Sequence, residues 1–429
     1  MINRTKSMFV LNALVVLALL LSACGSAVPA ASDEPVEITF LHIWAEEWQK
    51  PFFDEIIADF EAEHPNITVN TSLVPYTDSG AKMRAAALAN DASFDIVPTG
   101  PEFIASLVDV GYLEDLDPWL DGDPDFADSL VVQAPMKYKD TTRALGIYMF
   151  PFHLLYNVDL FEEKGIDPPS NWDEFMDAAR ALRDPEEGIY GYMGTMMYAE
   201  VLATRMFYYR LAQLGGQLLD ENGDVAFDSP EGLAAIKWWK NFWDEDLIDP
   251  ASLTTPWPGI MELMAAGRLG MFTDGPFTAK YLEGLNPDIN IAYAPPWRDK
   301  TGGIVWSVTG IGMSALSENK EAAWLFLKHL YSDKNSILLT NEIMGAPVPT
   351  KAVMDSLKTS DSAVMREVPA IMAQDPGASI QQPVLPNQEK LMDALQVGFH
   401  GVMLDEFTAE EALAEMAKVW QDEIDAARE

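Results

Sequence analysis

The chain has 429 residues, 48% of them hydrophobic, and its 67 acidic residues against 28 basic ones give a formal net charge of −39 at pH 7. Such a surface repels phosphate backbones and anionic lipid headgroups, which argues against nucleic acid as a partner. The length is sufficient for two lobes of ordinary domain size, and a single cysteine leaves no intramolecular disulfide.

The N-terminus has the pattern of an exported protein. Arg4 and Lys6 are the only charged residues before an apolar run over residues 8–21. This run is short for a bilayer core, which needs about 20 residues. A basic start, a short apolar segment and small residues at its end are typical of a signal peptide. We therefore expect a signal peptide over residues 1–23.

The only cysteine, Cys24, directly follows that segment. Residues 21–24, Leu-Ser-Ala-Cys, resemble the bacterial lipobox, in which the cysteine becomes the lipidated first residue of the mature protein. Residues 25–35 are small, polar and interrupted by proline, as in a flexible tether. We therefore expect a lipoprotein tether over residues 24–35, which places the chain outside the cytoplasm on the cell membrane. The alternative is an ordinary signal peptide with a cysteine there by chance.

Residues 36–111 alternate between strand and helix patterns. We expect strands near residues 36–44, 66–75 and 94–100, and helices near residues 49–65, 79–89 and 101–111. Repeated units of this kind predict a mainly parallel sheet covered by helices on both faces. Ligands bind such sheets beyond the carboxyl ends of the strands, so the loops after Trp44 and Pro98 are the expected site.

A second α/β block begins near residue 143. Asn171 and Glu174 have the spacing of a helix capping box, Asn222-Gly223 is a hairpin signal, and Ser229 precedes a proline at a helix start. Further strands are expected near residues 269–273, 289–296 and 304–314, and further helices near residues 318–333 and from 386 onward.

The sequence carries none of the familiar catalytic or phosphate-binding motifs. A Walker A loop, a serine nucleophile elbow, His-Glu-x-x-His and Gly-x-Gly-x-x-Gly are all absent, and the five histidines lie far apart. Five residues match calcium-loop positions, but Val225 stands where that loop needs glycine: Asp220, Asn222, Asp224, Asp228 and Glu231. A plain hairpin followed by a capped helix explains them, so we expect neither a metal nor a cofactor.

The mature chain resembles the family 1 extracellular solute-binding proteins, the maltose-binding-protein-like receptors of ABC importers. The resemblance rests on the order and spacing of segments 38–44, 94–117, 154–175, 215–239, 265–276 and 408–420. It implies an α/β fold of two lobes, each a mainly parallel sheet flanked by helices, joined by a hinge that crosses near residues 146–150, 291 and 331. Lobe 1 would comprise residues 36–146 and 292–331, and lobe 2 residues 147–291 and 332–429.

The resemblance also implies a function without chemistry. A sugar or oligosaccharide would be enclosed between the lobes and delivered to the ABC permease subunits by a monomeric, membrane-anchored receptor. Sugars pack on aromatic faces and hydrogen-bond to carboxylates and arginine. By position in the family, the candidate ligand-binding residues are Trp44, Glu46, Glu47, Thr99, Gly100, Glu102, Tyr148, Phe150, Arg205, Trp257, Asp274, Phe277 and Trp306.

Several alternatives stay open. Trp44 and Phe277 could be core residues, and Glu46 and Glu47 could be the solvated start of a helix. Trp239 and Trp243 share a helix face and are interpreted as packing. For the whole protein, the other function classes are a receptor for a polyamine or a metal complex, and a secreted glycosidase with paired carboxylates.

Overall fold

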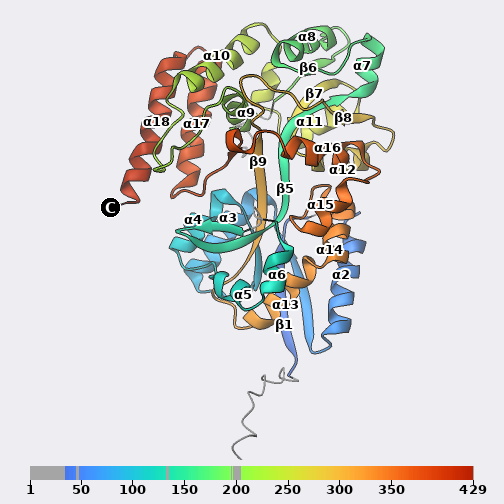
Figure 1. Cartoon of the computed structure of the whole chain (residues 1–429), viewed down its shortest axis with the longest axis vertical. Helices are drawn as coiled ribbons and strands as arrows, with labels where there is room; N and C mark the ends of the chain where they lie inside the picture. The colour runs from blue at the N-terminus through green and yellow to red at the C-terminus, as the bar shows by residue number, and fades with distance from the viewer. Residues whose placement is uncertain (1–33, 45–47, 132–134, 195, 197–203, 429) are drawn as a thin grey trace, which may run out of the picture.

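The computed structural model describes residues 34–44, 48–131, 135–194, 196 and 204–428 (Figure 1). The strands are β1 Val36–His42, β2 Ile67–Leu73, β3 Ile96–Thr99, β4 Pro135–Tyr138, β5 Thr141–Asn157, β6 Tyr190–Tyr192, β7 Leu269–Asp274, β8 Ile291–Tyr293, β9 Val305–Met313 and β10 Ile380–Gln381.

Helices surround these strands. The α-helices are α2 Lys50–Glu63, α3 Tyr76–Ala89, α4 Pro101–Asp109, α5 Asp117–Asp121, α6 Pro124–Ser129, α7 Val158–Lys164, α8 Trp172–Leu182, α9 Arg205–Gln213, α10 Pro230–Asp244, α11 Trp257–Ala265, α12 Phe277–Leu285, α13 Lys320–Leu330, α14 Asp333–Leu338, α15 Lys351–Leu357, α16 Ala363–Met372, α17 Gln388–Met403 and α18 Ala409–Ala426. Short 3-10 turns occupy Pro250–Leu253 and Pro376–Ala378, and a π-helical turn occupies Leu339–Met344. Within the described residues, no helix is long and apolar enough to cross a membrane.

The strands are joined in the order β2-β1-β3-β9-β5-β7-β6. At one end β1 is parallel to β2 and to β3, and at the other β6 is parallel to β7. These are the pairings that β–α–β crossovers produce. Between the two ends, β9 is antiparallel to β3 and to β5, and β5 is antiparallel to β7. The expected two-lobed α/β fold is confirmed, with an antiparallel seam where the long strands cross.

Strand β5 is the longest connection between the two lobes. Its residues 145–152 pair with β9, whereas residues 153–156 pair with β7 and residues 155–157 with β8. Figure 1 shows β5 and β9 running side by side through the middle of the molecule, with α2–α6 and α13–α15 toward one end and α7–α12 toward the other. Helices α17 and α18 form a pair beside α10.

Local sequence signals account for most helix boundaries. In α2 the buried residues Phe53, Ile56 and Phe60 repeat at helical spacing. The side chain of Asn171 accepts hydrogen bonds from the backbone N–H groups of residues 173 and 174, as expected of an N-cap. The Glu174 carboxylate, however, accepts from the backbone N–H and hydroxyl of Ser170, one residue before the expected partner.

Two predicted elements differ in extent. Helix α3 begins at Tyr76, three residues before the expected start, because Pro75 takes an extended conformation and serves as its N-cap. The predicted hairpin at Asn222-Gly223 is a tight turn closed by a single antiparallel bridge between Leu219 and Val225, with Gly223 at a φ of 77°. The flanking apolar runs are too short to form a longer ladder.

Aromatic residues dominate the interior. Trp172, Phe175, Trp238, Trp239 and Phe242 pack together between α8 and α10, with ring centroids 4.7–6.1 Å apart. Trp239 is almost fully buried, so its interpretation as a packing residue is confirmed. Rings of this size bury large areas and account for much of the stability of the lobe.

Candidate functional site

An aromatic pocket lies where β5 passes between the two halves of the sheet. Its volume is about 130 Å³. It is lined by side chains from the segment after β1, from β5, from α11 and α12, and from the π-helical turn: Ile43, Trp44, Trp48, Gln49, Tyr148, Trp257, Phe277, Lys280, Tyr281, Ile343 and Met344. Elements from both ends of the molecule therefore contribute to this aromatic pocket.

Its rings are in mutual contact. Trp257 lies 4.6 Å from Tyr281 and 5.9 Å from Phe277 between ring centroids. Phe277 meets Phe150 edge-on at 5.1 Å, and Phe150 stacks on Tyr148 at 5.8 Å. Gly275 is required behind them, because a Cβ there would approach the ring of Phe150 to 2.4 Å. The rings form a continuous wall onto which an apolar face can pack.

Asp274 holds the indole of Trp257 in this wall. The carboxylate is fully buried and accepts hydrogen bonds from Trp257 Nε1 at 2.7 Å, from Thr278 Oγ1 at 2.8 Å and from the Gly275 N–H at 2.8 Å. Both oxygens are thus used within the protein. Asp274 therefore supports the orientation of Trp257, and its predicted contact with the ligand stays a prediction.

A polar cluster, defined by Tyr76, Thr99, Glu102, Arg205, Ser307 and Gln382, lies beside the wall. The Tyr76 hydroxyl donates to Glu102 Oε1 at 2.6 Å. Glu102 is 5% exposed, and its second oxygen has no hydrogen-bond partner in the described structure; the same holds for Oγ1 of the fully buried Thr99. Gly100 allows this approach, because a Cβ there would come within 2.2 Å of the Tyr76 hydroxyl.

Arg205 occupies the opposite side of the cluster. Its side chain is 3% exposed and donates to Gln382 Oε1 and, at 3.4 Å, to Ser307 Oγ, while its guanidinium lies 6.0 Å from the Tyr208 ring centroid. Its Nε has no hydrogen-bond partner in the described structure. Three separate segments, α9, β9 and the residue after β10, therefore converge on one guanidinium.

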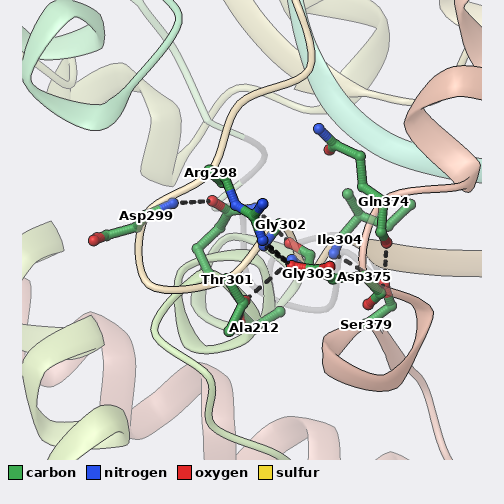
Figure 2. A network of polar contacts seen from close by, with 11 residues as sticks. Ala212, Arg298, Asp299, Thr301, Gly302, Gly303, Ile304, Gln374, Asp375 and Ser379 are labelled. Atoms are coloured by element: carbon green, nitrogen blue, oxygen red, sulfur yellow. Dashed lines mark hydrogen bonds and ion pairs between the residues drawn. The ribbon is translucent and has the colours of Figure 1, made fainter.

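A network of backbone and side-chain contacts keeps these three segments together (Figure 2). The loop from Arg298 to Ile304 is held between the end of α9 and the segment after α16. Thr301 Oγ1 donates to the Ala212 carbonyl at 2.6 Å, the Gly302 N–H donates to Asp375 at 2.8 Å, and the Ile304 N–H donates to Ser379 Oγ at 3.2 Å. This network fixes the ends of the elements that present Arg205, Ser307 and Gln382.

Strand register joins the aromatic pocket to the polar cluster. On β9, Ser307 lies opposite Phe150 of β5, Thr309 lies opposite Tyr148, and Gly310 lies opposite Thr99 of β3. Tyr148 therefore stands between the Arg205 side and the Glu102 side of the cluster. The aromatic wall and the polar cluster therefore meet at Tyr148.

The tyrosine hydroxyls at this junction remain protonated. Burial raises the pKa of Tyr148 to about 12. The pKa of Tyr76 is raised well above its ordinary value, chiefly by burial and further by the neighbouring Glu102 carboxylate. Both hydroxyls can therefore donate hydrogen bonds throughout the physiological pH range.

The structure brings most of the sequence-predicted residues together. Four line the aromatic pocket: Trp44, Tyr148, Trp257 and Phe277. Two support it from behind, Phe150 and Asp274, and four belong to or flank the polar cluster, Thr99, Gly100, Glu102 and Arg205. Trp306 is half-buried on β9 and packs against both main cores. Glu46, Glu47 and Cys24 lie outside the described residues.

Sequence reasoning missed several residues of this region. Tyr76 follows β2 at its carboxyl end, so the rule that pointed to the loops after β1 and β3 could have found it. Trp48 lies two positions beyond Glu46. Gln382 and Tyr281 carry no such signal, because only the folded chain brings them to the site.

Another hollow and an acidic turn lie outside this region and lack its aromatic residues. A larger hollow of about 410 Å³ lies beyond Lys280, between α12 and the π-helical turn, and no aromatic side chain lines it. The residues at the calcium-loop positions form a turn, in which Asp224 accepts hydrogen bonds from Arg428 at 2.6 Å and from Gln421 at 3.0 Å. Among the described residues, no group of three or more potential metal ligands is assembled.

Comparison with protein families gives a match over most of the chain. A family profile described as bacterial extracellular solute-binding protein matches residues 45–337. A putative binding protein of Brucella abortus is 27% identical over 361 residues, which cover 82% of this chain and 85% of that protein. The melibiose/raffinose/stachyose-binding protein MelE of Bacillus subtilis is 25% identical over 309 residues, 68% of each chain.

Solved structures show the same fold. A solute-binding protein of Thermotoga lettingae bound to α-D-tagatose superposes with a TM-score of 0.76 at 25% identity, covering 91% of this chain and 99% of that one. Maltose-bound MalE3 of T. maritima gives a TM-score of 0.77 at 21% identity, covering 90% of this chain and 99% of that one.

Proposed function

This chain belongs to the bacterial extracellular solute-binding protein family, and from that premise we propose that it is the receptor of an ABC importer for a sugar or oligosaccharide. The ligand binds between the lobes and is handed to a permease in the membrane. The relatives support this choice, because one binds melibiose, raffinose and stachyose and the Thermotoga lettingae neighbour holds tagatose. Binding favours the closed arrangement of the lobes and so shifts its population.

One observation carries the proposal: an aromatic wall lies beside buried, partly unpaired polar groups. Trp257, Phe277 and Tyr148 provide faces for the C–H patches of a sugar ring. Glu102 and Arg205 provide strong hydrogen-bonding partners for its hydroxyls. Trp44 and Phe277 thus serve the ligand in this proposal, although both also pack against neighbouring rings.

We further propose that the protein binds its ligand without converting it. A glycosidase needs two carboxyl groups facing the scissile bond, one of them available as a general acid. In the described part of the site, Asp274 uses both oxygens within the protein and leaves Glu102 as the remaining buried carboxylate. Incubation with melibiose, raffinose and maltose, followed by chromatography, is expected to return each sugar intact. Appearance of monosaccharides would contradict this proposal.

A polyamine receptor is the second candidate, and the acidic chain and Glu102 are the observations in its favour. A polyamine, however, would bring positive charge toward Arg205 and would leave the Nε of that side chain without a partner. The aromatic residues drawn from both ends of the molecule favour a sugar.

A thermal-shift screen tests these candidates together. A ligand that binds only the native state raises the melting temperature, because it increases the free energy of unfolding. The increase is about 2.7 kcal/mol at a ligand concentration of one hundred times its Kd. We expect shifts with one or more of tagatose, ribitol, melibiose, raffinose and maltose, and none with spermidine or divalent metal ions. A rise in melting temperature with spermidine alone would support the polyamine receptor instead of the sugar receptor.

The anchoring of the receptor is a separate proposal. Lipidation at Cys24, after removal of residues 1–23, would hold the protein at the cell membrane through a tether over residues 24–35. Cys24→Ser is expected to move the protein from the membrane fraction to the soluble fraction, because the lipid supplies the apolar attachment. Membrane retention of Cys24→Ser equal to that of the unmodified chain would rule out the lipoprotein.

The lobe boundaries also stay a prediction, with crossings near residues 146–150, 291 and 331. Ion pairs bear on the last of these. Lys334 of α14 pairs with Glu55 at 3.3 Å and with Asp59, both on α2. This contact favours a third crossing after α14.

We propose a monomeric receptor, and sedimentation velocity of the purified chain tests that state.

A further inference from the structure

Three buried polar atoms of the polar cluster lack hydrogen-bond partners in the described structure: Thr99 Oγ1, Glu102 Oε2 and Arg205 Nε. Their side chains are 0%, 5% and 3% exposed. An unpaired polar group that is buried costs about 1–3 kcal/mol, and more when it is charged. Buried groups of this kind in one cluster indicate that a ligand completes their hydrogen bonds.

Two of these groups carry opposite charge and demand opposite partners. An ionised Glu102 oxygen can only accept a hydrogen bond, and Arg205 Nε can only donate one. Arg205 is attached to β9 at Ser307, and the strand segment leading to Glu102 lies opposite Gly310. Three residues of strand separate those anchors, or about 10 Å at the usual rise per residue. The two charged side chains are thus anchored at different positions along the sheet, on either side of Tyr148.

The remaining charges near the wall are already balanced inside the protein. Asp274 is held by Trp257, Thr278 and its own loop. Lys280 pairs with Glu342 at 3.4 Å and lies over the Trp48 ring at 5.6 Å. Among the described residues around the wall, Glu102 and Arg205 are therefore the two charges left for the ligand to satisfy, and together they are neutral.

We infer that this pair selects an uncharged sugar unit that offers a hydroxyl donor to Glu102 and a hydroxyl acceptor to Arg205. A hydroxyl group both donates and accepts, so one type of group serves both ends. A uronate would add a second negative charge to this buried pair, and an amino sugar would add a second positive charge, so either ligand would leave the site with an unbalanced charge. An unbalanced charge in a buried site is costly. The inference rests on the proposed sugar-receptor function and adds the charge class of the ligand.

Matched ligands and a single-atom substitution test it. The full chain is solubilised in a detergent without a sugar headgroup, and dissociation constants are measured by calorimetry. The probes are glucose, glucuronate and glucosamine, with galactose, galacturonate and galactosamine, alongside melibiose, raffinose and maltose. The unmodified protein is expected to bind at least one neutral sugar and to bind the charged analogues at least about tenfold more weakly.

Glu102→Gln is the decisive variant, because it keeps the shape of the side chain and removes its charge. It is expected to weaken neutral-sugar binding about tenfold or more and to raise the affinity for a uronate relative to that sugar by a similar factor. Arg205→Gln is expected to shift the ratio toward amino sugars. Because Arg205 also joins three segments, the melting temperature of the Arg205→Gln protein is measured first. If that variant is unfolded, Glu102→Gln alone tests the inference.

Glu114→Gln is the matched control. Glu114 is paired with Lys320 at 2.6 Å, away from the polar cluster. The Glu114→Gln protein is therefore expected to show the same ratios of charged-sugar to neutral-sugar affinity as the unmodified chain. Equal or tighter binding of a uronate or an amino sugar by the unmodified chain would overturn the charge inference and leave the sugar receptor in place. An unchanged ratio in Glu102→Gln would also overturn it. Binding of no carbohydrate at all would overturn the proposed function itself.

Discussion

A buried carboxylate normally requires strong compensation, and Asp274 obtains it from three donors of which one is the Trp257 indole. The carboxylate thereby limits the rotation of a half-buried tryptophan whose other neighbours are Tyr281 and Phe277. A ring held in this way loses little entropy when a sugar packs on it. The position of Trp257 is therefore determined before the ligand arrives.

Trp257→Ala tests whether this ring contacts the ligand. A contact residue of this kind costs about 2 kcal/mol or more on truncation, or a roughly 30-fold loss of affinity, whereas the stability of the ligand-free protein should change little. Calorimetry with the best ligand and the melting temperature without ligand are measured on the same protein. Trp238→Ala is the control: it is half-buried in the aromatic core of the α8–α10 region and should lose stability while keeping its affinity. The reverse pattern would make Trp257 a core residue.

His153 predicts how stability depends on pH. Burial lowers its pKa to about 4 from 6.5, because the charged ring loses its hydration, and this effect exceeds the opposing effect of the hydrogen bond to the Ala294 carbonyl at 3.0 Å. The unfolded chain therefore binds the proton first as pH falls. Stability from this group is complete above pH 6.5 and is lost progressively down to about pH 4, by up to about 3 kcal/mol.

Denaturant unfolding at pH 7 and pH 4.5 measures this loss. Burial also lowers the pKa of His42 to about 4, so His153→Gln should reduce the pH-dependent loss without abolishing it. A His153→Gln protein with the full pH dependence would show that other groups cause it.

At the scale of elements, the stability of helix α8 depends on Asn171, the N-cap residue directly before its first turn. Asn171 satisfies two backbone N–H groups that have no partner inside the helix. Asn171→Ala should therefore lower the free energy of unfolding by about 1 kcal/mol, and Asn171→Ser should restore most of it. Urea unfolding followed by circular dichroism gives both values. Equal stability of all three proteins would show that packing of Trp172 and Phe175 alone determines this helix start.

Elements with local signals could be predicted from the sequence, and elements that depend on distant partners could not. The periodicity of Phe53, Ile56 and Phe60 and the cap at Asn171 give α2 and α8 directly. The length of β5 and its antiparallel partners could not be predicted, because residues of β9 and β7 more than a hundred positions away define them. The site divides in the same way. Thr99 is the last residue of a strand and is predictable, whereas Gln382 reaches Arg205 only through tertiary packing.

At the scale of the molecule, ion pairs connect the two ends across the site. Arg84 of α3 pairs with Glu389 of α17 at 2.9 Å, and Lys280 of α12 pairs with Glu342 of the π-helical turn. Each joins an element beside the β2-β1-β3 end to an element beside the opposite end. Such contacts favour the arrangement in which the ends are close, and exposed pairs of this kind contribute about 0.2–1 kcal/mol.

Removal of the Arg84–Glu389 pair should therefore weaken ligand binding slightly. Arg84→Ala, Glu389→Ala and the double variant are expected to raise the Kd by up to about fivefold at low salt, non-additively, and by little at about 1 M salt. The control is Lys50→Ala, which breaks a pair with Asp54 inside α2 and should leave the Kd unchanged. A salt-independent or additive effect would show that the pair does not couple the two ends.

The insertion of β9 between β3 and β5 also determines the order of events during folding. Thr99 meets Gly310 and Tyr148 meets Thr309, so the middle of the sheet closes only after more than 300 residues of chain are present. Closing loops of this length is entropically costly, and sheets dominated by such distant pairings form slowly. Until β9 arrives, β3 and β5 expose unpaired edges. We therefore expect a long-lived, incompletely paired intermediate during synthesis, a form that a cell can still thread through a narrow export channel.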